Sequence, residues 1–166
     1  VDSPLAAHWL GLMEQSFENV TFARVDADTL DKLIQKDEEI PSKLTKEQEE
    51  SLLPVFETAL NNKQKFEVSF ESMHSTEAPI IITQPEFIRR MMEQQKVGGA
   101  GFYGVFPEKY NVVVNGNHEK ISEILNTSSD DQAKKVKLLT DLALLSQGML
   151  SGEALNSFIE RSIELV

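Results

Sequence analysis

The C-terminal stretch of the sequence, residues 136–166, carries more apolar side chains than a terminal helical hairpin can bury against its own subunit. In "VKLLTDLALLSQ" (136–147) the apolar residues extend past one helical face, and the following helix has a single apolar stripe at helical spacing. Leaving these side chains in water would create a larger apolar patch than monomers normally expose. Two hairpins paired about a twofold axis would bury them as a four-helix bundle.

The alternative is that both helices pack wholly within one subunit, but the pattern favours a homodimer formed through the last two helices. The predicted dimer interface consists of apolar side chains from both helices: Val136, Leu139, Leu142, Ala143, Leu155, Phe158, Ile159 and Ile163.

The rest of the sequence predicts an α+β fold in two parts, residues 1–40 and 41–166. The first part is a small αβα segment with a helix over 5–15, a strand over 20–25 and a helix ending near residue 34. An acidic stretch separates it from a helix over 45–61, which opens with a Thr45–Gln48 capping box and is interrupted or kinked at Pro54. Strands over 65–70, 78–83 and 110–115 form a three-stranded sheet, followed by helices over 118–125, 130–147 and 151–166.

Composition excludes several classes of partner and site. The formal net charge is -11 and no basic cluster is present, so we expect no nucleic acid and no anionic membrane surface as partner. The sequence has no Cys and no apolar run long enough to span a bilayer, which suits a cytoplasmic protein. It starts at Val1 in place of Met, as expected of a fragment.

The sequence shows no catalytic apparatus. Residues 99–104 match G-x-G-x-x-G, but a helix precedes them and Pro107 follows, whereas a dinucleotide site needs a strand before and a helix after. His8, His74 and His118 lack the spacing of metal ligands, so each is expected on the surface or at a helix cap. We therefore predict no enzyme activity, no metal and no cofactor in this chain, with a small-molecule enzyme using the glycine-rich loop as a weaker alternative.

A second apolar stripe lies in "EFIRRMMEQQ" (86–95), where Phe87, Ile88, Met91 and Met92 recur at helical spacing. Such a stripe is usually part of the core. Methionine is unbranched and polarizable, however, so Met-rich surfaces also adapt to partners of varied shape.

The order of these elements resembles the C-terminal region of the ninety-kilodalton heat-shock chaperones in their bacterial form. The most specific part is the ending, "LLTDLALLSQGMLSGEALNSFIERSIELV", and the second marker is "APIIIT" leading into the 86–95 helix. Residues 1–34, including "FARVDADTLDKL", resemble the end of the preceding middle domain.

The resemblance implies a homodimeric chaperone that assists protein folding under stress, joined through its final two helices. It implies that ATP and Mg are bound by a part of the parent protein absent here. It also implies that Phe87, Ile88, Met91 and Met92 contact partly folded client proteins, contrary to the usual core assignment. The ending "SIELV" replaces the acidic tail that eukaryotic cytosolic members use to dock co-chaperones. A free-standing homodimeric interaction module without chaperone activity is the alternative.

Overall fold

The computed structural model describes the chain except residues 1–5, 23–39, 63, 86, 93–107 and 165–166. It forms two compact units, each considered by itself: the first contains Val1–Gln35 and Thr83–Tyr110, the second Lys36–Ile82 and Asn111–Val166. The division of the chain into residues 1–40 and 41–166 stays a prediction.

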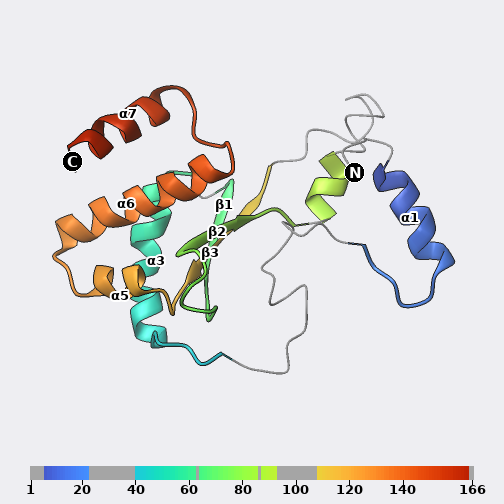
Figure 1. The fold of residues 1–166 in the computed structure, drawn as a ribbon, viewed down its shortest axis with the longest axis horizontal. Coiled ribbons are helices and arrows are strands. Elements are labelled where there is room, and N and C mark those ends of the chain that lie inside the picture. Colours follow the sequence, from blue (N-terminus) through green and yellow to red (C-terminus); the bar gives the residue numbers. More distant parts are fainter. Residues whose placement is uncertain (1–5, 23–39, 63, 86, 93–107, 165–166) are drawn as a thin grey trace. The chain divides into compact units, whose positions relative to one another are not determined.

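The second unit is built on the predicted three-stranded sheet, with β1 (Phe66–Glu71), β2 (Ile80–Thr83) and β3 (Tyr110–Asn115) in the order β1-β3-β2 (Figure 1). The central strand β3 supplies Val112, Val113 and Val114, all buried. The combination of helices with this sheet confirms the α+β class.

Helix α3 (Lys46–Leu60) packs against β1 and against the later helix α6. The predicted capping box is present, because the Thr45 hydroxyl accepts from the Gln48 amide while the Gln48 side chain accepts from the Thr45 amide. The helix continues through Pro54 without being interrupted. Its buried Phe56 meets the Phe70 ring of β1 edge to face, with ring centroids 5.8 Å apart.

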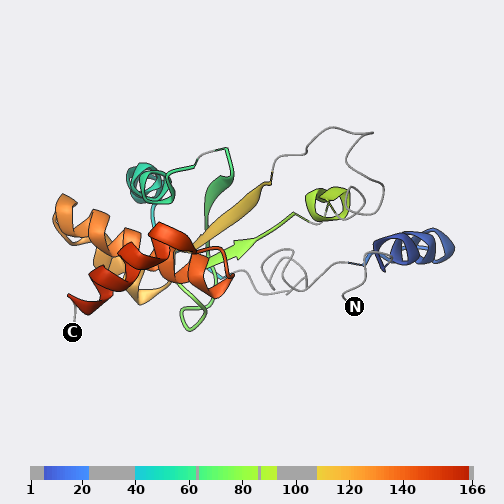
Figure 2. The ribbon, with the colours of Figure 1, turned by 90° about the horizontal axis from the view of Figure 1, so that it is seen from above.

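The C-terminal part contains α5 (Glu119–Leu125), α6 (Ser129–Ser146) and α7 (Gly152–Ile163). His118 caps α5 by accepting from the Lys120 amide, as expected of a helix-cap histidine, and Ser128 caps α6. Gly148 follows α6 with a φ of +66°, a left-handed conformation that ends helices. The chain then returns, so that α7 lies along α6 (Figure 2). The predicted helical hairpin is therefore confirmed.

In the first unit the structure describes α1 (Ala6–Ser16) and a short helix over 87–92. The predicted strand over 20–25 is wrong where it can be compared, because residues 20–22 form no strand. Strand propensity reflects packing against neighbouring strands more than an intrinsic backbone preference, and these residues pair with no described strand. The predicted helix ending near residue 34 lies outside the described residues, as does the glycine-rich loop over 99–104.

Candidate functional site

Helix α6 divides into an inner and an outer face. Val136, Thr140, Ala143 and Leu144 are buried and follow the helical repeat, so they form the face that packs on the rest of the second unit. Leu142 and Leu145 project from the opposite side, and Leu142 is 45% exposed. The helix thus carries leucines on a face that its own subunit leaves open.

Helix α7 shows the same division over a shorter length. Phe158 is buried, whereas Ile159 is 45% exposed and Ile163 is 68% exposed. These two isoleucines are one helical turn apart and therefore lie on the same side of α7. We call the exposed residues Leu142, Leu145, Ile159 and Ile163 the hairpin apolar surface.

The predicted interface residues fall into three groups. Leu142, Ile159 and Ile163 are exposed, and Leu139 and Leu155 are partly buried. Val136, Ala143 and Phe158 are buried within the subunit, so their side chains belong to its own core. Leu145 is exposed but was not among the predicted interface residues, although its helical spacing from Leu142 could have placed it there.

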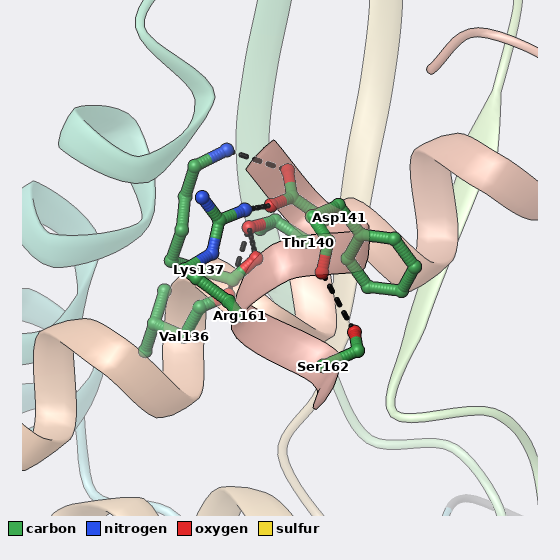
Figure 3. Close-up of polar contacts among 7 residues, drawn as sticks. Val136, Lys137, Thr140, Asp141, Arg161 and Ser162 are labelled. Carbon is green, nitrogen blue, oxygen red and sulfur yellow. Dashed lines mark hydrogen bonds and ion pairs between the residues drawn. The ribbon is translucent and has the colours of Figure 1, made fainter. Parts of the chain in front are cut away.

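A buried carboxylate joins the two helices of the hairpin. The Asp141 side chain is fully buried, and one of its oxygens, Oδ1, accepts from Lys137 Nζ at 2.5 Å. The other, Oδ2, accepts from the Arg161 guanidinium of α7, also at 2.5 Å (Figure 3). Sequence reasoning missed this group. The Lys137–Asp141 spacing of four within a leucine-rich helix was its only local signal.

The predicted client-contact residues lie on the 87–92 helix in the first unit. Phe87 is 68% exposed, whereas Ile88, Met91 and Met92 are partly buried. The Met92 sulfur lies 3.4 Å from the Gln84 side-chain amide nitrogen, which donates to it. The stripe is therefore open at Phe87 and partly covered along the rest of its length.

Arg90 attaches this short helix to α1. Its guanidinium donates to both carboxylate oxygens of Glu14, at 2.8 and 2.9 Å, and to the Phe22 carbonyl at 2.5 Å. The Phe22 amide in turn donates to Glu14 Oε1 at 2.7 Å. The hydrogen bonds from Arg90, followed by that from Phe22, lower the pKa of the Glu14 carboxyl to about 2. Glu14 is therefore ionised and paired at neutral pH.

Helix α1 exposes apolar side chains of its own. Trp9 is 64% exposed, Leu12 and Met13 are also exposed, and Phe17 is exposed directly after the helix ends. The sequence places Trp9, Leu12 and Met13 on one helical face, but no role was predicted for them. Their size and exposure are the signal that could have marked them as a contact surface.

The described residues offer little for small-molecule chemistry. Among them, no three His, Asp or Glu side chains gather as metal ligands would. No described helix combines the length and hydropathy needed to cross a membrane.

An open groove of about 580 Å³ lies between α3 and α6, lined on the α6 side by Gln132, Ala133 and Lys137. The His74 ring contacts the Thr76 hydroxyl at 2.7 Å, and the side chain of His8 lies outside the described residues.

Comparison with known proteins relates the whole chain to one kind of protein. It is 29% identical to the chaperone protein HtpG of Bacteroides thetaiotaomicron, 30% identical to that of Porphyromonas gingivalis and 28% identical to that of Bacteroides fragilis. Each alignment includes all of this chain. The chain is a relative of the HtpG chaperones.

The chain spans 34% of the length of each of these HtpG relatives. The alignments run over 234 positions, against the 166 residues of this chain, so HtpG carries residues within the matched region that this chain lacks. No family model matches the sequence. The likeness to HtpG along the whole chain confirms the resemblance drawn from the sequence.

Proposed function

We propose that this chain is the self-association and client-contact region of an ATP-dependent chaperone that assists protein folding. The observation that carries the proposal is the hairpin apolar surface, exposed on a chain related to HtpG along its whole length. A second copy would cover this surface in a four-helix bundle. The surface lies at the chain's end, where the sequence predicts dimerisation.

Substituting exposed residues tests self-association without disturbing the core. Leu142→Asp combined with Ile163→Asp places charges where two hairpins would meet, and we expect a monomer in light scattering at micromolar concentration. Ala154→Asp, at an exposed α7 position outside the hairpin apolar surface, is the matched control and should leave the dimer intact. A dimer in both proteins would refute the assigned interface.

Client contact is assigned to the first unit. Phe87 presents its ring to solvent, with Ile88, Met91 and Met92 beside it in the stripe, and the Arg90–Glu14 pair attaches this helix to α1 with its exposed Trp9. Partly folded proteins expose apolar side chains of their own, so adaptable apolar contacts suit them.

Phe87→Ser together with Trp9→Ser should reduce the suppression of client aggregation by the whole chaperone and leave its dimer intact. Glu67→Ser, at an exposed position of β1 in the second unit, is the control. Unchanged suppression by the double variant would remove client contact from these residues.

The chain spans only 34% of the length of its HtpG relatives, which supports placing other activities in the rest of the parent protein. We assign ATP and Mg to the parts of the parent protein outside this chain, and no cofactor to the chain itself. A permanent dimer in the cytoplasm would keep two ATP-binding arms at high effective concentration, making their closure intramolecular. A dimer that fails to bind clients would favour the free-standing interaction module.

A further inference from the structure

The described core contains one ionisable side chain. Asp141 is buried together with four uncharged polar residues, and it has no access to solvent. Removing a carboxylate from water costs several kcal/mol, which a paired cation in good geometry only roughly offsets. Apolar residues of similar volume at such positions often stabilise a protein as well or better. Stability alone therefore does not explain a charge at this point of a leucine-rich helix.

The location of the group connects it with the hairpin apolar surface. Asp141 precedes the exposed Leu142 in the sequence of α6, and Arg161 falls between the exposed Ile159 and Ile163 in that of α7. Neighbours one or two positions apart on a helix point to different sides, so the pair faces inward on the same two helices that carry the exposed side chains. An ion pair between positions 141 and 161 fixes both the rotation of α7 and its position along α6. The apolar contacts of Phe158 are non-directional. Without the ion pair they would allow α7 to rotate or to shift along α6.

We propose that the Asp141–Arg161 pair is a specificity element that selects one setting of α7 on α6, and thereby one mode of pairing with a second copy of this chain. The inference rests on the proposed self-association. Single polar groups in apolar interfaces are known to fix the register and number of paired helices at some cost in stability. Lys137 supports the pair by holding the second carboxylate oxygen.

The decisive variant is Asp141→Leu with Arg161→Met, which replaces the pair by apolar side chains and leaves the partly exposed Lys137 to solvent. We expect a melting temperature equal to or above that of the parent chain, because no unpaired buried charge remains. Sedimentation velocity should show several associated species in place of one dimer. The control is Lys120→Gln with Glu123→Gln, which removes an exposed pair of 2.9 Å on α5 and should change neither measurement.

A milder variant covers the case in which the apolar protein fails to fold. Arg161→Met leaves Asp141 paired with Lys137, so the buried charge stays compensated while the link to α7 is lost. We expect the fold to be kept and dimerisation to weaken by about tenfold or more.

A single dimer with the parent's dissociation constant in the variants would overturn the inference and leave the proposed function standing. A parent chain that is monomeric at every concentration would overturn self-association itself, and the inference with it.

Discussion

Asn117 connects three segments of the second unit through its polar atoms. Its side-chain amide donates to the Pro41 carbonyl at 3.0 Å and to the Met73 carbonyl at 3.1 Å, and its side-chain oxygen accepts from the Lys43 amide at 2.7 Å. Its own backbone amide donates to Asn115 Oδ1. All three side-chain hydrogen bonds are made with backbone groups, so the Asn117 amide satisfies backbone donors and acceptors of the segments around it.

Replacing Asn117 by Leu should therefore be costly. The substitution leaves the buried Met73 carbonyl, and the part-buried Pro41 carbonyl and Lys43 amide, without their partner. We expect the free energy of unfolding to fall by about 1–3 kcal/mol. Urea denaturation followed by circular dichroism measures this change. Asn126→Ala is the control, because Asn126 is exposed and bonds only within its own helix, so its loss should cost well under 1 kcal/mol.

Glu14 makes the attachment of the 87–92 helix sensitive to acid. Its pKa is lowered to about 2 in the folded chain, so its pairing with Arg90 contributes stability that is complete above the unfolded pKa of about 4.3. That contribution is lost as the pH falls from about 4.3 through 2. We expect the protection of residues 87–92 against hydrogen exchange, measured relative to the intrinsic exchange rate at each pH, to fall over this window. In Glu14→Gln the same residues should already be less protected at pH 7. Because the variant has no carboxyl group to protonate at this position, their protection should not fall further between about pH 4.3 and 2.

The hairpin depends on a connector with a left-handed backbone conformation that favours glycine at position 148. Gly148 has a φ of +66°, and a methyl group added there would meet no neighbouring atom within 4 Å. The cost of Gly148→Ala therefore comes from backbone conformation alone, and we expect about 1 kcal/mol less stability. Gly11→Ala is the matched control: it lies inside α1, also has open space, and should be neutral or stabilising. Equal thermal shifts in the two variants would contradict this assignment.

The elements that the sequence predicts correctly are those with local signals. Thr45 with Gln48, Ser128, His118 and Gly148 each act within a few residues, so the caps and ends they specify can be recognised without knowing the fold. Residues 20–22 resemble a strand by composition, but forming one requires a pairing partner that no local pattern supplies.

The candidate sites also contain a part that local spacing predicts and a part that it does not. Helical spacing predicts that Leu142, Ile159 and Ile163 share exposed faces, and it also groups them with Val136 and Phe158, which are buried. Periodicity cannot separate the two sides of a helix that is apolar nearly all round. The Arg161–Asp141 and Arg90–Glu14 pairs join residues 20 and 76 positions apart, so only the tertiary structure brings them together.

The two candidate surfaces belong to different compact units, so each can be altered by substitutions in its own unit. The hairpin apolar surface lies in the second unit, and Phe87 and Trp9 lie in the first. The substitutions that address one surface leave the other unit's residues unchanged. Self-association would then act on client binding through the number of client surfaces in one particle, and not through their chemistry.

This separation predicts an effect of client length. In the proposed function a dimer would present two client surfaces. An extended unfolded protein that reaches both would then gain effective concentration, whereas a short peptide would reach only one. Leu142→Asp with Ile163→Asp should weaken binding of the long client by about 100-fold or more and leave the affinity for the peptide unchanged. Fluorescence anisotropy with a labelled unfolded protein and a labelled apolar peptide measures both, with Ala154→Asp as control. Equal weakening for the two ligands would mean that dimerisation shapes the client surface itself, and independence of the two units would have to be abandoned.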